Sequence, residues 1–166
     1  MLVETYVTNI CDTFVKADSA GAAVYKANAA AYTAKLRQLD AWIKAQVTQL
    51  PVQDRKLVLN HASHGYFADR YGFQVVGTVI PSVGTSESPT AQQLAALTAA
   101  IRKSGAKAIF VEKDENPQLA EQIAAETGIH VVTGLLDHSL TPADGAAPTY
   151  IDMMKYDTRR IVEALR

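Results

Sequence analysis

The segment Leu57–Phe73, LVLNHASHGYFADRYGF, decides how the rest of the chain is interpreted. Its first residues are apolar and predict a strand, a turn with His61 and His64 follows, and an aromatic stretch then predicts a helix. This order places the imidazole of His61 at the carboxyl end of a strand, where open α/β sheets bind their ligands.

The pattern on the carboxyl-terminal side of this segment is typical of a parallel sheet. From Arg55 onward, short apolar runs alternate with amphipathic helical stretches, as in βαβ units. The predicted strands are Lys56–Asn60, Gln74–Val79, Ala106–Glu112 and His130–Gly134. A last helix is predicted from Pro148 to Leu165.

The predicted helices between these strands have recognisable ends. Ser88-Pro89 and Asn116-Pro117 each combine an N-cap residue with proline at the first helical position. Gly105 and Gly128 stand where glycine commonly ends a helix.

The amino-terminal part of the chain is predicted to be helical. Residues Ser19–Leu50 contain no proline, and apolar or aromatic side chains recur at helical spacing up to Pro51. At about 1.5 Å per residue, such a helix spans roughly 40 Å, which suggests a strut between two bodies. A shorter helix, Val3–Ala17, is separated from it by the break Asp18–Gly21. We therefore expect helices over 1–54 and an α/β lobe over 55–166.

The expected fold class is a three-layer α/β lobe, in which helices flank a four-stranded parallel sheet and a long strut helix precedes it. The chain has 166 residues, of which 48% are apolar, enough for one core. A net charge of −1 argues against nucleic acid as a partner. The single cysteine, Cys11, is expected to be a small buried hydrophobic residue. Without a membrane-spanning run or signal pattern, the sequence taken alone indicates a cytosolic protein.

Four segments together resemble a known family. They are Leu57–Phe73, IFVEKDENPQLAEQIAAETGIHV, LLDHSL and TYIDMMKYDTRRIVEAL, and the likeness extends from about Val3 to the last residue. They resemble the carboxyl-terminal lobe of the metal-binding lipoproteins and adhesins that serve zinc and manganese ABC importers as solute-binding proteins. Members of that family hold the metal between two lobes, each of which supplies two ligands. The resemblance implies half of such a site here, in a periplasmic or extracellular protein held at the membrane by a lipid anchor.

The resemblance makes His61 a direct metal ligand. The family's turn, with its aromatic pair and following YG, is matched by His61, Tyr66, Phe67, Tyr71 and Gly72. A neutral imidazole at a rigid strand end is a good ligand for zinc or manganese. The alternative interpretation is a histidine that caps a helix, with its ring bonded to the backbone.

His64 forms an H-x-x-H pair with His61. Spacing i, i+3 on a helix can direct both side chains to one metal ion. Because the family usually has an apolar residue at this position, a surface or interface role is the alternative.

The segment GLLDHSLTP follows the last predicted strand, where the family supplies its remaining ligand. Alignment on Ser139-Leu140 gives His138 the ligand position, and an imidazole there favours zinc over manganese. A one-residue shift would give the position to Asp137, which could instead orient His138 or His61. An exposed pair without a role is the remaining alternative.

Glu112 lies at the carboxyl end of the third predicted strand. In a flavodoxin-like strand order it is close to the first strand's end, where it could accept a proton from His61 and fix its tautomer. It could equally be a solvated acid. His130 begins the fourth strand at the opposite edge and is expected to be structural.

Enzyme motifs are missing: there is no glycine-rich phosphate loop, G-x-S-x-G, C-x-x-C or H-E-x-x-H. Ser63 stands between two histidine positions, but adjacent residues on a turn are expected to point apart. We therefore expect no enzymatic activity.

The sequence thus predicts a metal-binding module with zinc (Zn2+) as its ion and manganese as the alternative. Its expected partners are an importer permease and either the missing amino-terminal lobe or a second copy of the chain, so a homo-oligomer is expected. The first alternative is a self-associating structural lobe that no longer binds metal. The second is a metal-dependent enzyme that uses His61 and His64.

Overall fold

The computed structural model describes residues 2–80, 89–137 and 139–166. The chain forms two compact units, Met1–Ala45 and Gln46–Arg166. The division falls within a long helix, whereas the sequence predicted a boundary after residue 54.

The first unit is a helical hairpin. Helix α1 spans Leu2–Ala17, and helix α2, Ala22–Val47, begins there and ends just inside the second unit. The Asp18 carboxylate accepts hydrogen bonds from the backbone N–H groups of Ala20 and Gly21 and from the Tyr25 hydroxyl. The Tyr25 bond and the backbone bonds lower the pKa of Asp18. The predicted long helix and the break before it are both present.

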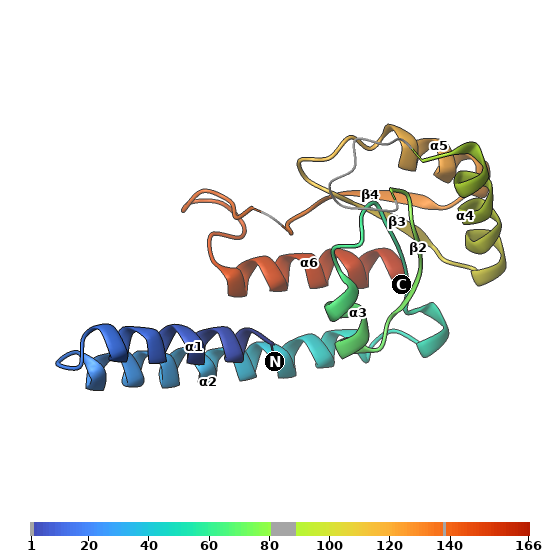
Figure 1. The fold of residues 1–166 in the computed structure, drawn as a ribbon. Helices are drawn as coiled ribbons and strands as arrows, with labels where there is room; N and C mark the ends of the chain where they lie inside the picture. Colours follow the sequence, from blue (N-terminus) through green and yellow to red (C-terminus); the bar gives the residue numbers. More distant parts are fainter. Residues whose placement is uncertain (1, 81–88, 138) are drawn as a thin grey trace. The chain divides into compact units, whose positions relative to one another are not determined.

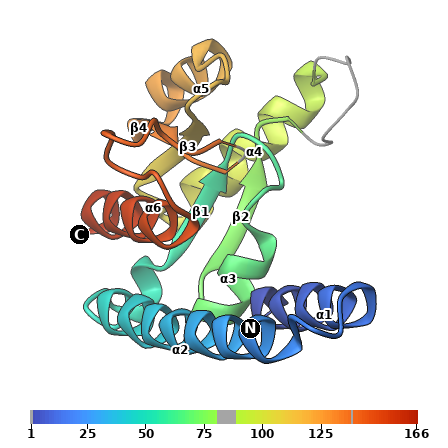
Figure 2. The same cartoon turned by 90° about the vertical axis from the view of Figure 1, so that its left-hand side faces the viewer.

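The second unit contains a four-stranded parallel sheet (Figures 1 and 2). The strands are β1 Lys56–Leu59, β2 Gln74–Thr78, β3 Ala108–Glu112 and β4 His130–Leu135, arranged in the order β2-β1-β3-β4. The register pairs Val58 with Ile109 and Phe110 with Val132. The chain passes from β1 to its neighbour β2 and then crosses back over β1 to β3, so the direction of the connections reverses beside β1. The carboxyl ends of β1 and β3 therefore form the position where such sheets bind ligands. The predicted α/β fold is confirmed.

Helices cover both faces of this sheet (Figure 2). Helices α4, Ala91–Ser104, and α5, Gln118–Thr127, pack on one face. Helices α3, Gly65–Tyr71, and α6, Tyr150–Leu165, lie on the other, and a short 3-10 helix, Val52–Asp54, precedes β1. The second unit is therefore a three-layer arrangement.

The core follows the alternation of side chains along β1 and β3. Val58, Ile109 and Val111 pack with Leu97 and Ile123 of the covering helices. Phe110 alternates with these residues and therefore faces the layer of α6, where it is only 1% exposed.

Two of the predicted helix starts differ from the structure. Helix α4 begins after Thr90, whose side chain forms a capping box with Gln93, whereas Ser88 lies outside the described residues. Helix α5 begins one residue after Pro117, with Asn116 Oδ1 accepting the N–H of Gln118.

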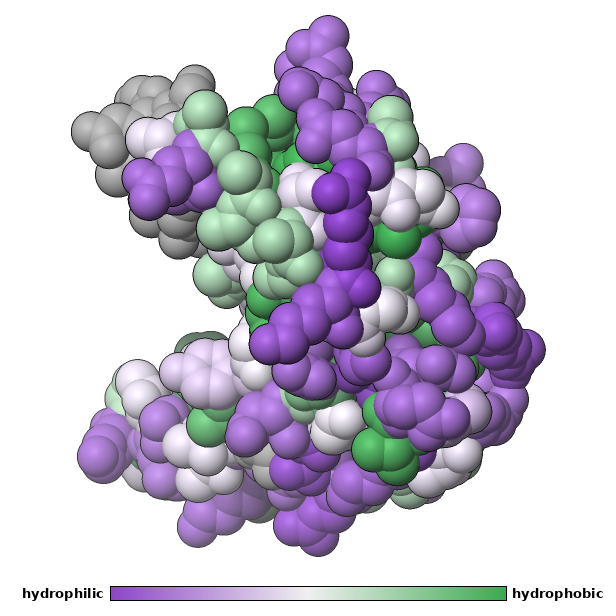
Figure 3. All heavy atoms as spheres, turned by 90° about the vertical axis from the view of Figure 1, so that its right-hand side faces the viewer, coloured by the Kyte–Doolittle hydropathy of each residue, from purple (hydrophilic) through white to green (hydrophobic). Residues whose placement is uncertain are grey.

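The predicted carboxyl-terminal glycines are confirmed: Gly105 and Gly128 have φ of +69° and +76°. The outward side of α4 carries small exposed alanines, and pale green spheres gather beside hydrophilic, purple ones on this face (Figure 3).

Candidate functional site

Polar side chains gather at the carboxyl edge of the sheet. They follow three adjacent strands, because β1 pairs with β3 and β3 pairs with β4. The described members are Asn60, His61, Ser63 and His64 after β1, Glu112, Asp114 and Glu115 at and after β3, and Asp137 and Ser139 after β4.

The imidazole of His61 lies close to a carboxylate that the sequence did not single out. Its Nε2 is 3.3 Å from Glu115 Oε2, and its side chain is 17% exposed. The contact is within ion-pair distance but does not meet hydrogen-bond geometry, so both ring nitrogens are buried without a hydrogen-bond partner among the described residues. Burying polar atoms in this way costs about 1–3 kcal/mol for each group unless a ligand or ion satisfies them.

His61 does not cap helix α3. The N-cap residue of that helix is His64, which makes no side-chain capping bond. The helix-capping interpretation of His61 is therefore wrong, because the turn places the helix start three residues further along the chain.

Ser63 connects Glu112 to His64. Its Oγ donates to Glu112 Oε1 at 2.8 Å and lies 2.8 Å from His64 Nδ1. A hydroxyl has one proton and a carboxylate can only accept, so the Nδ1–H of His64 donates to Ser63 Oγ. The expectation that these neighbours point apart is wrong. The proton of the hydroxyl is nevertheless directed to the carboxylate and not to the imidazole, unlike in a nucleophile–base pair.

Glu112 is 4% exposed, and its Oε2 has no hydrogen-bond partner among the described residues. Glu112 is thus not a solvated acid. It contacts Ser63, and the carboxylate beside His61 Nε2 is that of Glu115. The loop after β3 could have suggested Glu115, because acidic residues that follow a parallel strand reach the ligand edge of the sheet.

Asn60 is a second residue that the sequence analysis missed. Its side chain is buried directly before His61, and both amide atoms lack a partner among the described residues. A polar residue at the end of an apolar strand, next to a candidate ligand, is the signal that could have identified it.

The donor atoms at this edge suit a divalent metal ion but do not complete a site. Imidazole nitrogen and carboxylate oxygen are the ligand types of zinc and manganese proteins. Within residues 2–80, 89–137 and 139–166, however, no three His, Cys, Asp or Glu side chains are arranged to hold an ion together.

The loop after β4 is held from both sides. Leu136 N–H donates to Asp157 Oδ1 at 2.9 Å, and Ser139 Oγ donates to Asp114 Oδ2 at 3.1 Å. Asp137 lies between these two bonds and is half-buried. His138 lies outside the described residues, so the choice between His138 and Asp137 as ligand stays a prediction.

Asp157 of α6 is a buried acid, 4% exposed. Burial, and to a smaller extent the charge of Asp137, raises the pKa of Asp157 to about 7, although the bond from Leu136 and the charge of Arg160 act in the opposite direction.

We expect this acid to make stability depend on pH. The pKa of Asp157 rises from 3.8 to about 7 on folding, so the folded chain binds the extra proton and its stability falls as the pH rises from about 4 to 7. Asp157→Asn removes this dependence. Denaturant unfolding at pH 5 and pH 7 should show the variant gaining on the order of 1 kcal/mol relative to the unaltered chain at the higher pH. An equal difference at both pH values would contradict the assignment.

His130 lies at the first residue of β4 and is exposed, at the edge of the sheet opposite to these side chains. Its predicted location is therefore confirmed, and it serves as a control residue below.

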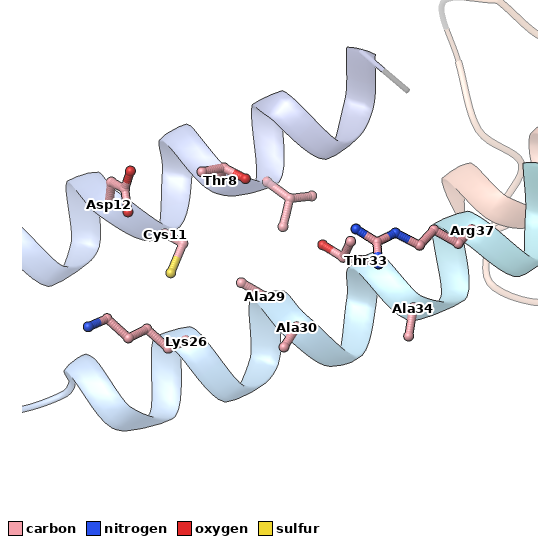
Figure 4. Close-up of a pocket in the computed structure, with 10 residues that line it drawn as sticks. Thr8, Cys11, Asp12, Lys26, Ala29, Ala30, Thr33, Ala34 and Arg37 are labelled. Atoms are coloured by element: carbon pink, nitrogen blue, oxygen red, sulfur yellow. The ribbon is translucent and has the colours of Figure 1, made fainter.

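A separate groove lies between α1 and α2 of the first unit (Figure 4). Cys11 Sγ faces it, with Asp12 and Lys26 at one end and Arg37 at the other. Cys11 and Asp12 are the only side chains of a metal-ligand type that line this groove, and Lys26 and Arg37 add positive charge to it, so it is a poorer candidate for a metal centre than the sheet edge.

Comparison with known proteins identifies the family. The family model described as zinc-uptake complex component A, periplasmic (ZnuA), matches residues 1–164. The chain belongs to the ZnuA family. The predicted resemblance is confirmed, and this family consists of solute-binding proteins of ABC transporters, not enzymes.

Curated relatives of this ZnuA-family chain carry the names of several metals. It is 32% identical over 163 residues to the manganese-binding lipoprotein MntA of Halalkalibacterium halodurans, covering 98% of this chain and 54% of the relative. It is 30% identical over 149 residues to the iron-binding protein YfeA of Yersinia pestis, covering 90% of this chain and 47% of the relative. The chain thus spans about half the length of the curated relatives it matches.

A solved structure of a metal-binding protein also matches this chain over nearly its whole length. The cadmium-bound periplasmic metal-binding protein from Candidatus Liberibacter asiaticus matches with a TM-score of 0.87 at 28% identity, over 99% of this chain and 60% of that chain. The relatives are periplasmic or extracellular proteins, several of them named lipoproteins. None of the helices that the structure describes could span a membrane.

Proposed function

We propose that this chain is the metal-ion-binding lobe of an ABC-importer solute-binding protein and carries half of an interlobe metal site. The observation that carries the proposal is the set of buried donor atoms at the carboxyl edge of the sheet. The ring nitrogens of His61 and the Oε2 of Glu112 lack hydrogen-bond partners among the described residues, and the Glu115 carboxylate is 3.3 Å from His61. A bound cation would satisfy such atoms.

The proposed ligands come from three segments, the loops after β1 and β4 and the end of β3 with its following loop. His61 ligates directly, Glu112 or Glu115 supplies a carboxylate or orients the imidazole, and the loop after β4 supplies His138 or Asp137. His64 is a second-choice ligand. Its Nδ1–H bond to Ser63 leaves Nε2 as the nitrogen with a lone pair, as is usual for metal-binding histidines.

Zinc is the proposed ion, with manganese as the alternative. A site with two imidazoles favours zinc, whereas one with carboxylates alone around His61 favours manganese. Relatives are named for manganese and iron, and a solved relative holds cadmium. The choice depends on whether His138 or Asp137 is the second ligand.

The proposed partners follow from the half-site. An importer permease would receive the metal, and a first lobe or a second copy of the chain would supply the remaining ligands. The exposed apolar residues Tyr6, Ile10 and Phe14 of α1 are compatible with a homo-oligomer.

We propose a periplasmic or extracellular location with a lipid anchor, as in the relatives. The buried ring nitrogens of His61 and Oε2 of Glu112, which have no hydrogen-bond partner among the described residues, favour this function over a structural lobe that no longer binds metal.

We expect the isolated chain to bind zinc weakly. It offers two or three protein ligands, whereas closed zinc sites normally use four. Titration calorimetry of monomeric protein should give a dissociation constant far above that of an intact two-lobe relative measured in parallel. Affinity equal to that of the two-lobe protein would contradict the half-site, and absence of zinc and manganese binding would favour the structural alternative.

A further inference from the structure

A carboxylate on α6 reaches the backbone of the loop that bears the candidate ligands. Asp157 Oδ1 accepts the N–H of Leu136, one residue before Asp137 and two before His138. From this contact we infer that Asp157 is a positioning residue for metal binding, which fixes the start of the loop after β4 so that its ligand reaches the sheet edge. The inference rests on the proposed function.

The bond to Asp157 is one of three that define where β4 ends. Lys113 N–H donates to the carbonyl of Leu135 at 2.8 Å, which keeps β4 beside the end of β3. Leu136 then turns its N–H to α6 and not to β3, and this change of partner marks the point where the chain leaves the sheet. After the candidate ligands, Ser139 donates to Asp114. Asp137 therefore lies between two residues, Leu136 and Ser139, that are each held by a hydrogen bond.

The hydrogen bond from Leu136 to Asp157 is not the only contact that attaches α6 to β4. Arg160, nearly one turn further along the helix, donates to the carbonyl of Thr133 at 2.6 Å. Buried apolar residues of α6, among them Ile161 and Leu165, add to this attachment. Loss of the Asp157 bond should therefore leave the helix in place and release only the loop.

The burial of Asp157 supports a specific role. The carboxyl group lies in a place where burial disfavours its charged form, and it has Asp137 as a like-charged neighbour. The other buried residues of α6 are largely aliphatic. An apolar residue at position 157 would avoid both the cost of burying a carboxylate and the repulsion from Asp137. What an apolar residue cannot provide is an acceptor for the Leu136 N–H.

The test uses the full chain and four variants. Asp157→Leu keeps the branched shape with larger terminal groups but has no acceptor, and Asp157→Ala removes the acceptor without adding volume. Asp157→Asn keeps a side-chain oxygen, and Glu163→Gln changes an exposed acid on the same helix. For each variant, calorimetry with zinc chloride gives the affinity, amide hydrogen exchange reports the Leu136 N–H, and thermal unfolding reports the fold.

We expect D157L to exchange the Leu136 amide at least about tenfold faster and to bind zinc about 10–100-fold more weakly, the usual loss when a group that orients a ligand is removed. D157N and E163Q should bind zinc within about threefold of the unaltered chain. Rescue by asparagine is the result that a purely electrostatic role could not produce.

Three outcomes would overturn the inference. They are a folded D157L with unchanged zinc affinity, a D157N as weak as D157L, and failure of both D157L and Asp157→Ala to fold, which would make Asp157 a folding residue. Absence of zinc binding by the unaltered chain would contradict the proposed function itself. If the unaltered chain binds zinc and D157L binds it equally well, only the role of Asp157 is contradicted.

Discussion

The His61→Ala variant is expected to lose at least about a hundredfold in zinc affinity, more than is usual when only an orienting group is removed. The reason is that the ring nitrogens of His61 are the buried imidazole donors at the described sheet edge without hydrogen-bond partners. The ion would then lose its direct imidazole ligand from the loop after β1, and the carboxylate oxygens beside it hold zinc less well than imidazole does. Calorimetry with the folded variant measures the loss.

The other histidines supply the controls for this variant. His130→Ala should leave zinc affinity unchanged, because His130 starts β4 at the opposite edge of the sheet. His138→Ala should resemble His61→Ala if the loop after β4 supplies an imidazole, and His64→Ala should have a small or intermediate effect. Equal losses in His61→Ala and His64→Ala, with none in His138→Ala, would instead indicate an H-x-x-H chelate and return the enzyme alternative to consideration.

Phe110→Ala should lower the free energy of unfolding by about 3–5 kcal/mol, the usual cost of truncating a buried phenylalanine. Phe110 is 1% exposed in the central strand β3, between Leu59 on β1 and Val132 on β4. The cavity would lie within the sheet that aligns the candidate ligands. Urea unfolding at constant pH measures the change.

Tyr66→Ala is the matched control for this substitution. Tyr66 is aromatic but 80% exposed, so its truncation should change the free energy of unfolding by less than about 0.5 kcal/mol. A loss below about 1 kcal/mol in Phe110→Ala would show that β3 is not the centre of the core.

The sheet could be predicted from the sequence because its signals are local. Apolar runs mark the strands, and Gly105 and Gly128 end helices through a left-handed conformation that favours glycine. The family resemblance then gave the position of His61. Periodicity, in contrast, cannot locate a boundary inside a continuous helix, because the division at Ala45 depends on contacts between distant residues.

The contacts within the candidate site could not be predicted in the same way. The approach of Glu115 to His61 joins two loops that are far apart in the chain, and the Ser63 bond to Glu112 depends on the conformation of the turn. The position of Asp157, in contrast, could have been recognised in the sequence. It lies four residues before Ile161, on the buried stripe of α6, where an acid is unusual and indicates a specific partner.

The central claim is that this lobe binds a metal ion at the carboxyl edge of its sheet through His61. Crystals grown with zinc, with diffraction recorded on both sides of the zinc absorption edge, test it most directly. The account predicts an anomalous peak about 2.0–2.1 Å from a ring nitrogen of His61, with a second ligand from the loop after β4. A peak elsewhere on the chain, or none at this edge at saturating zinc, would contradict it.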